Sequence, residues 1–234
     1  MTTVSGTTLD GVSATTLWTL HNRGSEAKRS DGVIRDPWAV TLLDTISYDY
    51  LKFGKPNQSH GLRAVAFDAA ARDYLAAHPK ASVVALAEGL QTSFWRLDRN
   101  GVLDETTWYS IDLPPVMELR DQLLPSDDRI VALAQSALDR SWMDRADATN
   151  GVFITAEGLL MYLEPEDALG LIADCAARFR RADDVRLDPP LVQRPHAEWL
   201  QAVVALHRAA DAVRPVRRRG LGAGGHHHRR AFGA

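Results

Sequence analysis

The chain is predicted to fold as an α/β protein with a mostly parallel, Rossmann-like sheet that carries helices on both faces. An apolar, β-branched run at 82–86 leads into the short turn 87–89, and a helix can begin near Thr92. A second strand-like segment, 107–111, is followed by Asp112, which lies 23 residues beyond Gly89. Strand-like and helix-like segments then alternate as far as residue 179. Together these observations indicate a nucleotide-type site at the ends of parallel strands.

Residues 1–80 are predicted to form an N-terminal helical cap region. Helices are expected at 12–27 and 60–77, and residues 1–10 are expected to be disordered. Another helix is expected to begin with Asp36 as its N-cap and Pro37 in its first turn, because these residue types favour a helix start. Residues 47–59, with a glycine, a proline and an asparagine, are expected to form a loop.

Residues 81–182 are predicted to form a Rossmann-like core that binds a nucleotide-type cofactor. Its strands are expected at 82–86, 107–111, 130–133 and 152–156, with helices from about 92, over 116–124 and over 165–179. Ligands of such sheets bind at the carboxyl ends of the strands. The site is therefore expected among residues 87–92, 112, 136–139 and 157–162.

Composition indicates an ordinary globular protein of 234 residues, with 45% hydrophobic and 24% charged residues. A net charge of −3 gives no reason to expect a nucleic-acid partner, and no apolar run is long enough to span a membrane. The single cysteine, Cys175, excludes an internal disulfide and is expected in the core. No secretory signal pattern opens the sequence, so a cytoplasmic location is expected.

The turn and the acid each have a second interpretation. The segment 87–92 reads Ala-Glu-Gly-Leu-Gln-Thr, which is a weaker pattern than the dinucleotide fingerprint and also suits an ordinary strand-to-helix turn. Asp112 either accepts hydrogen bonds from ribose hydroxyls or caps the helix that follows. The sequence pattern alone leaves both interpretations open, for the turn and for Asp112.

Two further segments carry a family resemblance. They are 157–163, Glu-Gly-Leu-Leu-Met-Tyr-Leu, and 111–114, Ile-Asp-Leu-Pro. With Asn22-Arg23, Asp36-Pro37, Leu62-Arg63-Ala64 and Glu88-Gly89-Leu90 in the same order, the chain resembles the leucine carboxyl methyltransferase-like group of class I S-adenosylmethionine-dependent O-methyltransferases. This group includes polyketide-tailoring enzymes. The resemblance runs from about Val12 to about Phe179.

The resemblance implies S-adenosyl-L-methionine as cofactor and a small-molecule methyl acceptor with a carboxylate or a hydroxyl group. It implies that Gly89, within the turn that also holds Ala87 and Glu88, lies beneath the methionyl part, and that Asp112 binds the ribose. Cofactor-binding roles are thus expected for Arg23 and Arg63 at the carboxylate, Ala137 and Leu138 at the adenine, Glu157 near the ammonium and Tyr162 near the sulfonium. Tyr162 could instead pack its own helix, and no catalytic base is assigned.

Three residues depart from the family pattern. Ala87 replaces the usual first glycine, Gln91 stands where an aspartate is common, and Ala137 stands where an aspartate is frequent. None of them forbids cofactor binding. Two alternative functions stay open: a catalytically dead remnant of such an enzyme, and a nicotinamide-dependent oxidoreductase. The oligomeric state is not predicted.

Residues 183–234 do not continue the family pattern and are predicted to form an aberrant, poorly ordered tail. The segment 181–234 contains ten arginines and no lysine, and three adjacent histidines, 226–228, lie in a glycine-rich stretch that does not suggest a metal site. A reading-frame shift near residues 180–182 or a divergent tail would explain the change. Either way, strands five to seven are expected to be missing. Strand 152–156 would then be an exposed sheet edge. The chain would therefore have low stability and low or absent activity.

Overall fold

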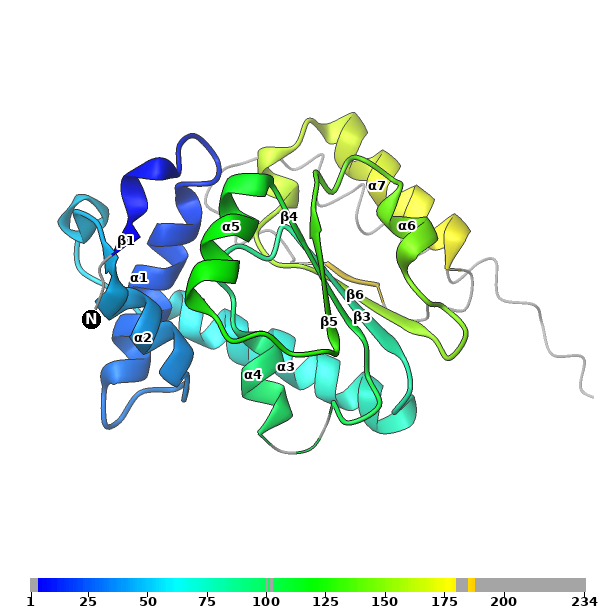
Figure 1. Cartoon of the computed structure of the whole chain (residues 1–234), viewed down its shortest axis with the longest axis horizontal. Helices are drawn as coiled ribbons and strands as arrows, with labels where there is room; N and C mark the ends of the chain where they lie inside the picture. Colours follow the sequence, from blue (N-terminus) through cyan, green and yellow to red (C-terminus); the bar gives the residue numbers. More distant parts are fainter. Residues whose placement is uncertain (1–3, 100, 102, 180–184, 188–234) are drawn as a thin grey trace, which may run out of the picture. The chain divides into compact units, whose positions relative to one another are not determined.

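The computed structural model describes residues 4–99, 101, 103–179 and 185–187, which lie within one compact unit. Its centre is a five-stranded parallel sheet in the order β5-β4-β3-β6-β7 (Figure 1). The strands are β3 (Ser82–Leu86), β4 (Trp108–Asp112), β5 (Ile130–Ala134), β6 (Val152–Ala156) and β7 (Val185–Leu187). The predicted α/β class with a parallel sheet is confirmed.

The strand order reverses beside β3, the central strand. From β3 the chain runs outward through β4 to β5, then returns to place β6 on the other side of β3. All five residues of β3 and of β4 are buried, as their apolar sequences predict. A reversal of this kind opens a crevice at the carboxyl ends of the central strands, which is where α/β sheets bind ligands.

Helices cover both faces of the sheet (Figure 1). On one face, α3 (Ser59–Ala77) and α4 (Ser93–Asp98) pack on β3, β4 and β6 in a core that includes Tyr74, Phe94, Trp108 and Phe153. The helices α6 (Trp142–Arg145) and α7 (Pro165–Arg178) lie on the other side. Cys175 of α7 is buried, as expected.

The N-terminal helices α1 (Thr15–Lys28) and α2 (Pro37–Thr45) pack on α5 (Pro114–Leu123). Asp36 caps α2 as predicted, because its Oδ1 accepts a hydrogen bond of 2.9 Å from the backbone N–H of Ala39. The core they share includes Leu17, Leu42 and Leu90, the last of which belongs to the turn after β3. The N-terminal region is therefore joined to the predicted site.

The expectation that the first ten residues are disordered is wrong for those that the structure describes. Residues 4–10 are not structureless: β1 (Val4–Ser5) pairs with β2 (Ile46–Ser47), the 3₁₀ turn η1 (Gly6–Thr8) follows, and Leu9 is buried in the same core. In the predicted loop 47–59, a second 3₁₀ turn, η2, spans Tyr50–Phe53.

The strand β6 is also not an exposed edge, because β7 pairs with it from Ile154↔Val185 to Ala156↔Leu187. The expectation that the fifth strand is missing is therefore wrong, because β7 is a fifth parallel strand of the sheet. Residues 188–234, with histidines 226–228, lie outside the described part of the chain, so the frame-shift hypothesis and the absence of strands six and seven stay predictions.

Candidate cofactor site

A cavity of about 620 Å³ opens at the carboxyl ends of β3, β4 and β6. This volume is typical of sites for small ligands. Of the ten residues predicted to bind the cofactor, nine line it: Arg63, Ala87, Glu88, Gly89, Asp112, Ala137, Leu138, Glu157 and Tyr162. The tertiary structure thus brings together residues that the sequence separates by up to 99 positions.

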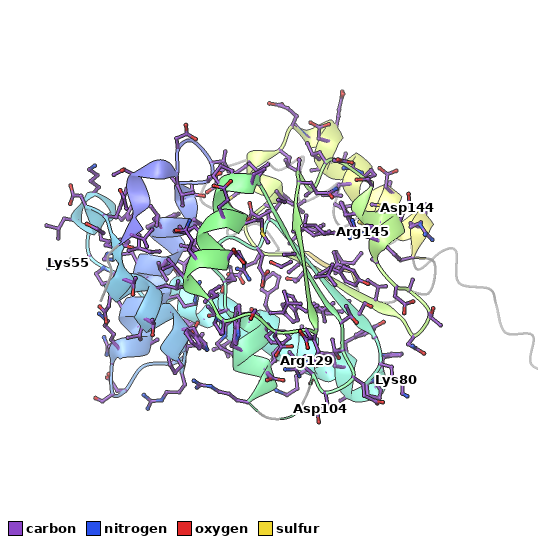
Figure 2. The ribbon with its side chains drawn as sticks, viewed as in Figure 1. Lys55, Lys80, Asp104, Arg129, Asp144 and Arg145 are labelled. Carbon is purple, nitrogen blue, oxygen red and sulfur yellow. The ribbon has the colours of Figure 1, made fainter. Side chains whose placement is uncertain are left out.

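Charged side chains at the amino ends of the strands lie apart from this cavity. Lys80, Asp104 and Arg129 stand just before β3, β4 and β5, and they are grouped at the opposite end of the sheet in Figure 2. Arg129 forms ion pairs of 2.6 Å with Asp98 and 2.7 Å with Asp127. These partly exposed pairs belong to the surface of the protein and play no part in the site.

The turn after β3 places two residues in a left-handed backbone conformation. Ala87 has φ 49° and Gly89 has φ 59°. Glycine adopts this conformation without a steric cost, whereas an alanine there is strained by about 1–2 kcal/mol. Ala87, which replaces a glycine of the family pattern, therefore carries strain at the edge of the cavity.

Asp112 anchors this turn from the end of the neighbouring strand. Its Oδ2 accepts a hydrogen bond of 2.6 Å from the Gly89 N–H, and its Oδ1 accepts one of 2.7 Å from the Leu113 N–H. Burial raises the pKa of the Asp112 carboxyl, although both hydrogen bonds favour its charged form. The N-cap of α5 is Leu113, so the alternative interpretation of Asp112 as that cap is wrong.

Gly89 also has no room for a side chain. A Cβ at this position would lie 2.5 Å from Oγ1 of Thr16, which accepts a 2.7 Å hydrogen bond from the Leu90 N–H. The resemblance implied only that Gly89 lies beneath the methionyl part of the cofactor. The structure shows that it would collide with α1, so Gly89 is needed for packing whether or not a ligand is bound.

Arg120 on α5 holds the other side of the turn, and it was not among the predicted site residues. Its Nη1 donates to the carbonyl oxygens of Gly89 at 2.7 Å and Gln91 at 2.8 Å. Its Nη2 lies 2.9 Å from Oε2 of Glu88. A signal existed in the sequence: Arg120 falls on the apolar face of its helix with Val116 and Met117, and a charged residue in that position needs a buried partner.

Glu88 lines the cavity, but its carboxylate is bonded within the protein. Besides Arg120, it accepts hydrogen bonds from Ser110 Oγ and from Trp108 Nε1, the latter at 3.2 Å. Burial raises the pKa of the Glu88 carboxyl, against the effect of Arg120. The side chain therefore stabilises the turn from the sheet side.

Arg23 is the one predicted residue that the structure does not place on the cavity wall. Its side chain is fully buried, forms a 3.0 Å ion pair with Asp36, and donates from Nη2 to the Leu90 carbonyl at 2.6 Å. Its Nη1 is buried and has no hydrogen-bond partner among the described residues. Arg23 thus supports the Leu90 backbone, and its expected contact with the cofactor carboxylate stays a prediction.

Opposite charges meet at the end of β6. The Nε of Arg63 lies 2.9 Å from Oε1 of Glu157, and Gln91 Nε2 donates to the same oxygen. Both charged side chains are less than one-tenth exposed. Gln91 has a buried Oε1 with no hydrogen-bond partner among the described residues. The wall thus presents a cation, an anion and an unused acceptor side by side.

The mouth of the cavity is apolar. Five of its lining side chains are large hydrophobic residues that remain exposed: Val12, Trp18, Leu113, Met161 and Tyr162. Tyr162 belongs to the 3₁₀ turn η3 (Leu160–Tyr162) and is 41% exposed, so it does not pack into the core. Apolar surface of this kind at a cavity mouth is typical of sites for apolar ligands.

The leucine carboxyl methyltransferase family model matches residues 16–176, more than half of the chain. The chain belongs to the leucine carboxyl methyltransferase family. This membership implies S-adenosyl-L-methionine as cofactor, and the cavity fits that group: it has the volume, a carboxylate at the second strand, and groups of both charges. In the part of the chain that the structure describes, no cluster of three or more metal-ligating side chains occurs.

Two proteins similar to this chain carry methyltransferase names. The chain is 34% identical over 164 residues to the tetracenomycin polyketide synthesis O-methyltransferase TcmP of Streptomyces glaucescens, a match that covers 68% of this chain and 59% of the relative. It is 33% identical over 195 residues to a Mycobacteroides abscessus protein provisionally named an S-adenosyl-L-methionine-dependent methyltransferase, with coverage of 70% and 62%. The chain therefore spans about three fifths of the length of these relatives.

Proposed function

We propose that this chain is an S-adenosylmethionine-dependent O-methyltransferase that acts on a carboxylate or hydroxyl group of a small molecule. The observation that carries the proposal is the convergence of the Gly89 turn, Asp112 and the Arg63–Glu157 pair on one cavity of about 620 Å³. The name of the polyketide O-methyltransferase relative supports it. An oxidoreductase and a dead remnant are the less favoured alternatives.

In this proposal each part of the cofactor has its own residues. Asp112 accepts hydrogen bonds from the ribose hydroxyls with its remaining lone pairs, and Ala137 and Leu138 provide apolar contact for the adenine. The methionyl carboxylate is bound by Arg63, whose planar guanidinium suits a carboxylate, and the ammonium by Glu157. Arg23, Glu88 and Arg120 act indirectly, by fixing the turn.

The cofactor supplies a methyl group already activated on a sulfonium sulfur. The protein's task is then to hold donor and acceptor in line, which is the source of much of the acceleration in such reactions. Tyr162 stands at the mouth with an aromatic face that can attract the cation. The apolar residues around it keep water from the reacting atoms.

We also propose a small-molecule partner, not a nucleic acid or a membrane, and a cytoplasmic location. The apolar cavity mouth and the net charge of −3 support the first, and the single cysteine supports the second. No helix in the described residues is both long enough and apolar enough to cross a membrane.

Calorimetric titration of the 234-residue chain with S-adenosylmethionine and, separately, with a nicotinamide dinucleotide tests the proposal. We expect binding of the first and none of the second. Replacing Asp112→Ala should weaken cofactor binding by about 10- to 100-fold, because a charged hydrogen bond contributes about 1.5–3 kcal/mol. Asp104→Ala, at the opposite end of the sheet, is the matched control and should bind as the unaltered chain does.

Tighter binding of the nicotinamide dinucleotide would support an oxidoreductase. Loss of all binding in the unaltered chain would support a dead remnant. An Asp112→Ala variant with unchanged affinity would remove the ribose assignment.

A further inference from the structure

A second, much smaller cavity adjoins the cofactor cavity. Its volume is about 20 Å³, and its polar wall consists of Glu88, Gln91, Ser93, Thr155 and Glu157. Three of these residues, Glu88, Gln91 and Glu157, line the cofactor cavity as well. The two cavities therefore share a wall, and a change in the small one can reach the proposed cofactor site through that wall.

Gln91 is the part of the shared wall that joins the turn after β3 to the end of β6. Its backbone is held at both ends, since its N–H donates to the Glu88 carbonyl at 3.1 Å and its carbonyl accepts from Arg120 at 2.8 Å. Its side chain is 6% exposed, and Nε2 donates to Oε1 of Glu157. The amide has one orientation, because its oxygen would face a carboxylate if it were turned round.

That orientation leaves Oε1 of Gln91 buried, with no hydrogen-bond partner among the described residues. A buried acceptor without a partner is costly, so a donor is expected beside it. The small cavity lies against the same side chain, and its 20 Å³ can hold one water molecule, which needs roughly 10–15 Å³ and two to four polar partners. A ligand the size of a cofactor group does not fit there.

The wall of the small cavity provides these partners. Oγ of Ser93 already accepts a 2.7 Å hydrogen bond from Arg96 Nη2, so its own hydrogen can be donated. Thr155 contributes a second hydroxyl, and the carboxylate of Glu88 is a further acceptor. A water in this place can accept from a hydroxyl while it donates to Gln91 and to a carboxylate.

We propose that one buried water occupies the small cavity and donates to Oε1 of Gln91, and that Gln91, held in this way, positions Glu157 for the cofactor ammonium. The inference rests on the proposed function, in which Glu157 binds that ammonium. It gives a role to Gln91, which the sequence marked only as a departure from the family pattern.

The amide is what this arrangement requires. An aspartate at position 91 would have no hydrogen to donate to Glu157, and it would bring a second negative charge toward the first. The glutamine replaces that repulsion with a hydrogen bond, but its oxygen is then left to be satisfied from the other side. Gln91 is a positioning residue in this scheme, because it acts on the cofactor through Glu157.

The first test compares two nucleosides by calorimetry. S-adenosylhomocysteine carries the ammonium and carboxylate, and 5′-methylthioadenosine lacks both. Gln91→Met keeps the length of the side chain without its polar atoms. We expect it to weaken S-adenosylhomocysteine binding by about 10- to 100-fold and to leave 5′-methylthioadenosine within about twofold, because only the first ligand needs Glu157.

Two further variants complete this test. Gln91→Glu keeps the shape but places a carboxylate beside Glu157, so its loss should be at least as large as that of Gln91→Met. Gln122→Met, an exposed glutamine of α5, is the matched control and should bind both nucleosides as the unaltered chain does. Equal losses for the two nucleosides in Gln91→Met would mean a general distortion of the turn and would overturn the positioning role. Unchanged affinity in Gln91→Glu would do the same.

The second test looks for the water by crystallography of the ligand-free chain, at a resolution that shows ordered water. We expect one water within hydrogen-bond distance of Oε1 of Gln91. Thr155→Val removes a hydroxyl from the small cavity, and Thr155 does not line the cofactor cavity. The variant should lose or displace the water and weaken S-adenosylhomocysteine binding, by less than Gln91→Met does.

Thr41→Val, which removes an exposed hydroxyl on α2, is the control for Thr155→Val and should change neither the water nor the affinity. An empty small cavity in the unaltered chain, or a water that does not contact Gln91, would refute the water site. So would a Thr155→Val variant that loses the water without any change in affinity, because the water would then not support Glu157.

These outcomes differ from a failure of the proposed function. If the unaltered chain binds S-adenosylhomocysteine and Gln91→Met binds it equally well, only the inference about Gln91 is rejected. If the unaltered chain binds neither nucleoside nor S-adenosylmethionine, the methyltransferase function fails and the role toward the ammonium fails with it. The crystal structure still decides in that case whether the water site exists.

Discussion

The two sides of the cavity differ in how firmly the protein holds them. In the turn 87–92, side chains from three other elements bind the backbone: Thr16 and Arg23 of α1, Asp112 of β4 and Arg120 of α5. On the mouth side, η3 is a single 3₁₀ turn whose Met161 and Tyr162 are 52% and 41% exposed.

This difference indicates a division of tasks. A backbone whose polar groups are already satisfied by buried side chains keeps its geometry, which reduces the entropy lost when a ligand binds. Exposed apolar side chains on a short turn can adjust to different ligand shapes. We infer that the firmly held side serves the cofactor and the exposed side serves the acceptor.

The largest expected effect is at Arg120. Arg120→Met should lower the free energy of unfolding by about 3–5 kcal/mol, because it leaves the buried Glu88 carboxylate without its cation and two carbonyls without donors. Urea unfolding measures the loss. Arg129→Met removes a partly exposed arginine with two ion pairs and should cost about 1 kcal/mol or less. Equal losses in the two variants would show that the turn is not specially held.

A smaller effect is expected at Gly89. Gly89→Ala should destabilise the chain by about 2 kcal/mol, from a left-handed alanine and from contact with Thr16. In a Thr16→Ala background the contact is relieved, so the same change should cost only the backbone strain. Thermal unfolding of the four combinations gives the coupling, and strictly additive losses would show that α1 does not press on the turn.

The smallest expected effect is at Met161. Met161→Ala should change the free energy of unfolding by no more than about 0.5 kcal/mol, since half of the side chain is already exposed. Cofactor affinity measured by calorimetry should stay the same, while KM for an apolar acceptor such as 2-naphthol should rise. Loss of cofactor affinity in this variant would contradict the division between the two sides.

Much of the sheet and of the site was predictable from the sequence. The apolar runs of β3 and β6 lie at 82–86 and 152–156, as predicted, because a buried parallel strand is apolar on both faces. The strand β7, by contrast, has only three residues, in which Val185 and Leu187 flank an arginine. Two apolar residues are too short a pattern to predict a strand. The exposed edge predicted for β6 was wrong for that reason.

The sequence by itself determined the parallel α/β class, the helix start at Asp36 and the family, since these depend on residue patterns within one element or one short motif. Only the tertiary structure decided which charged side chains face a ligand. Arg23 bonds to a carbonyl 67 residues away, and Arg63 pairs with a carboxylate 94 residues away. The stability of a buried charge depends on partners that packing brings close, and no local pattern specifies them.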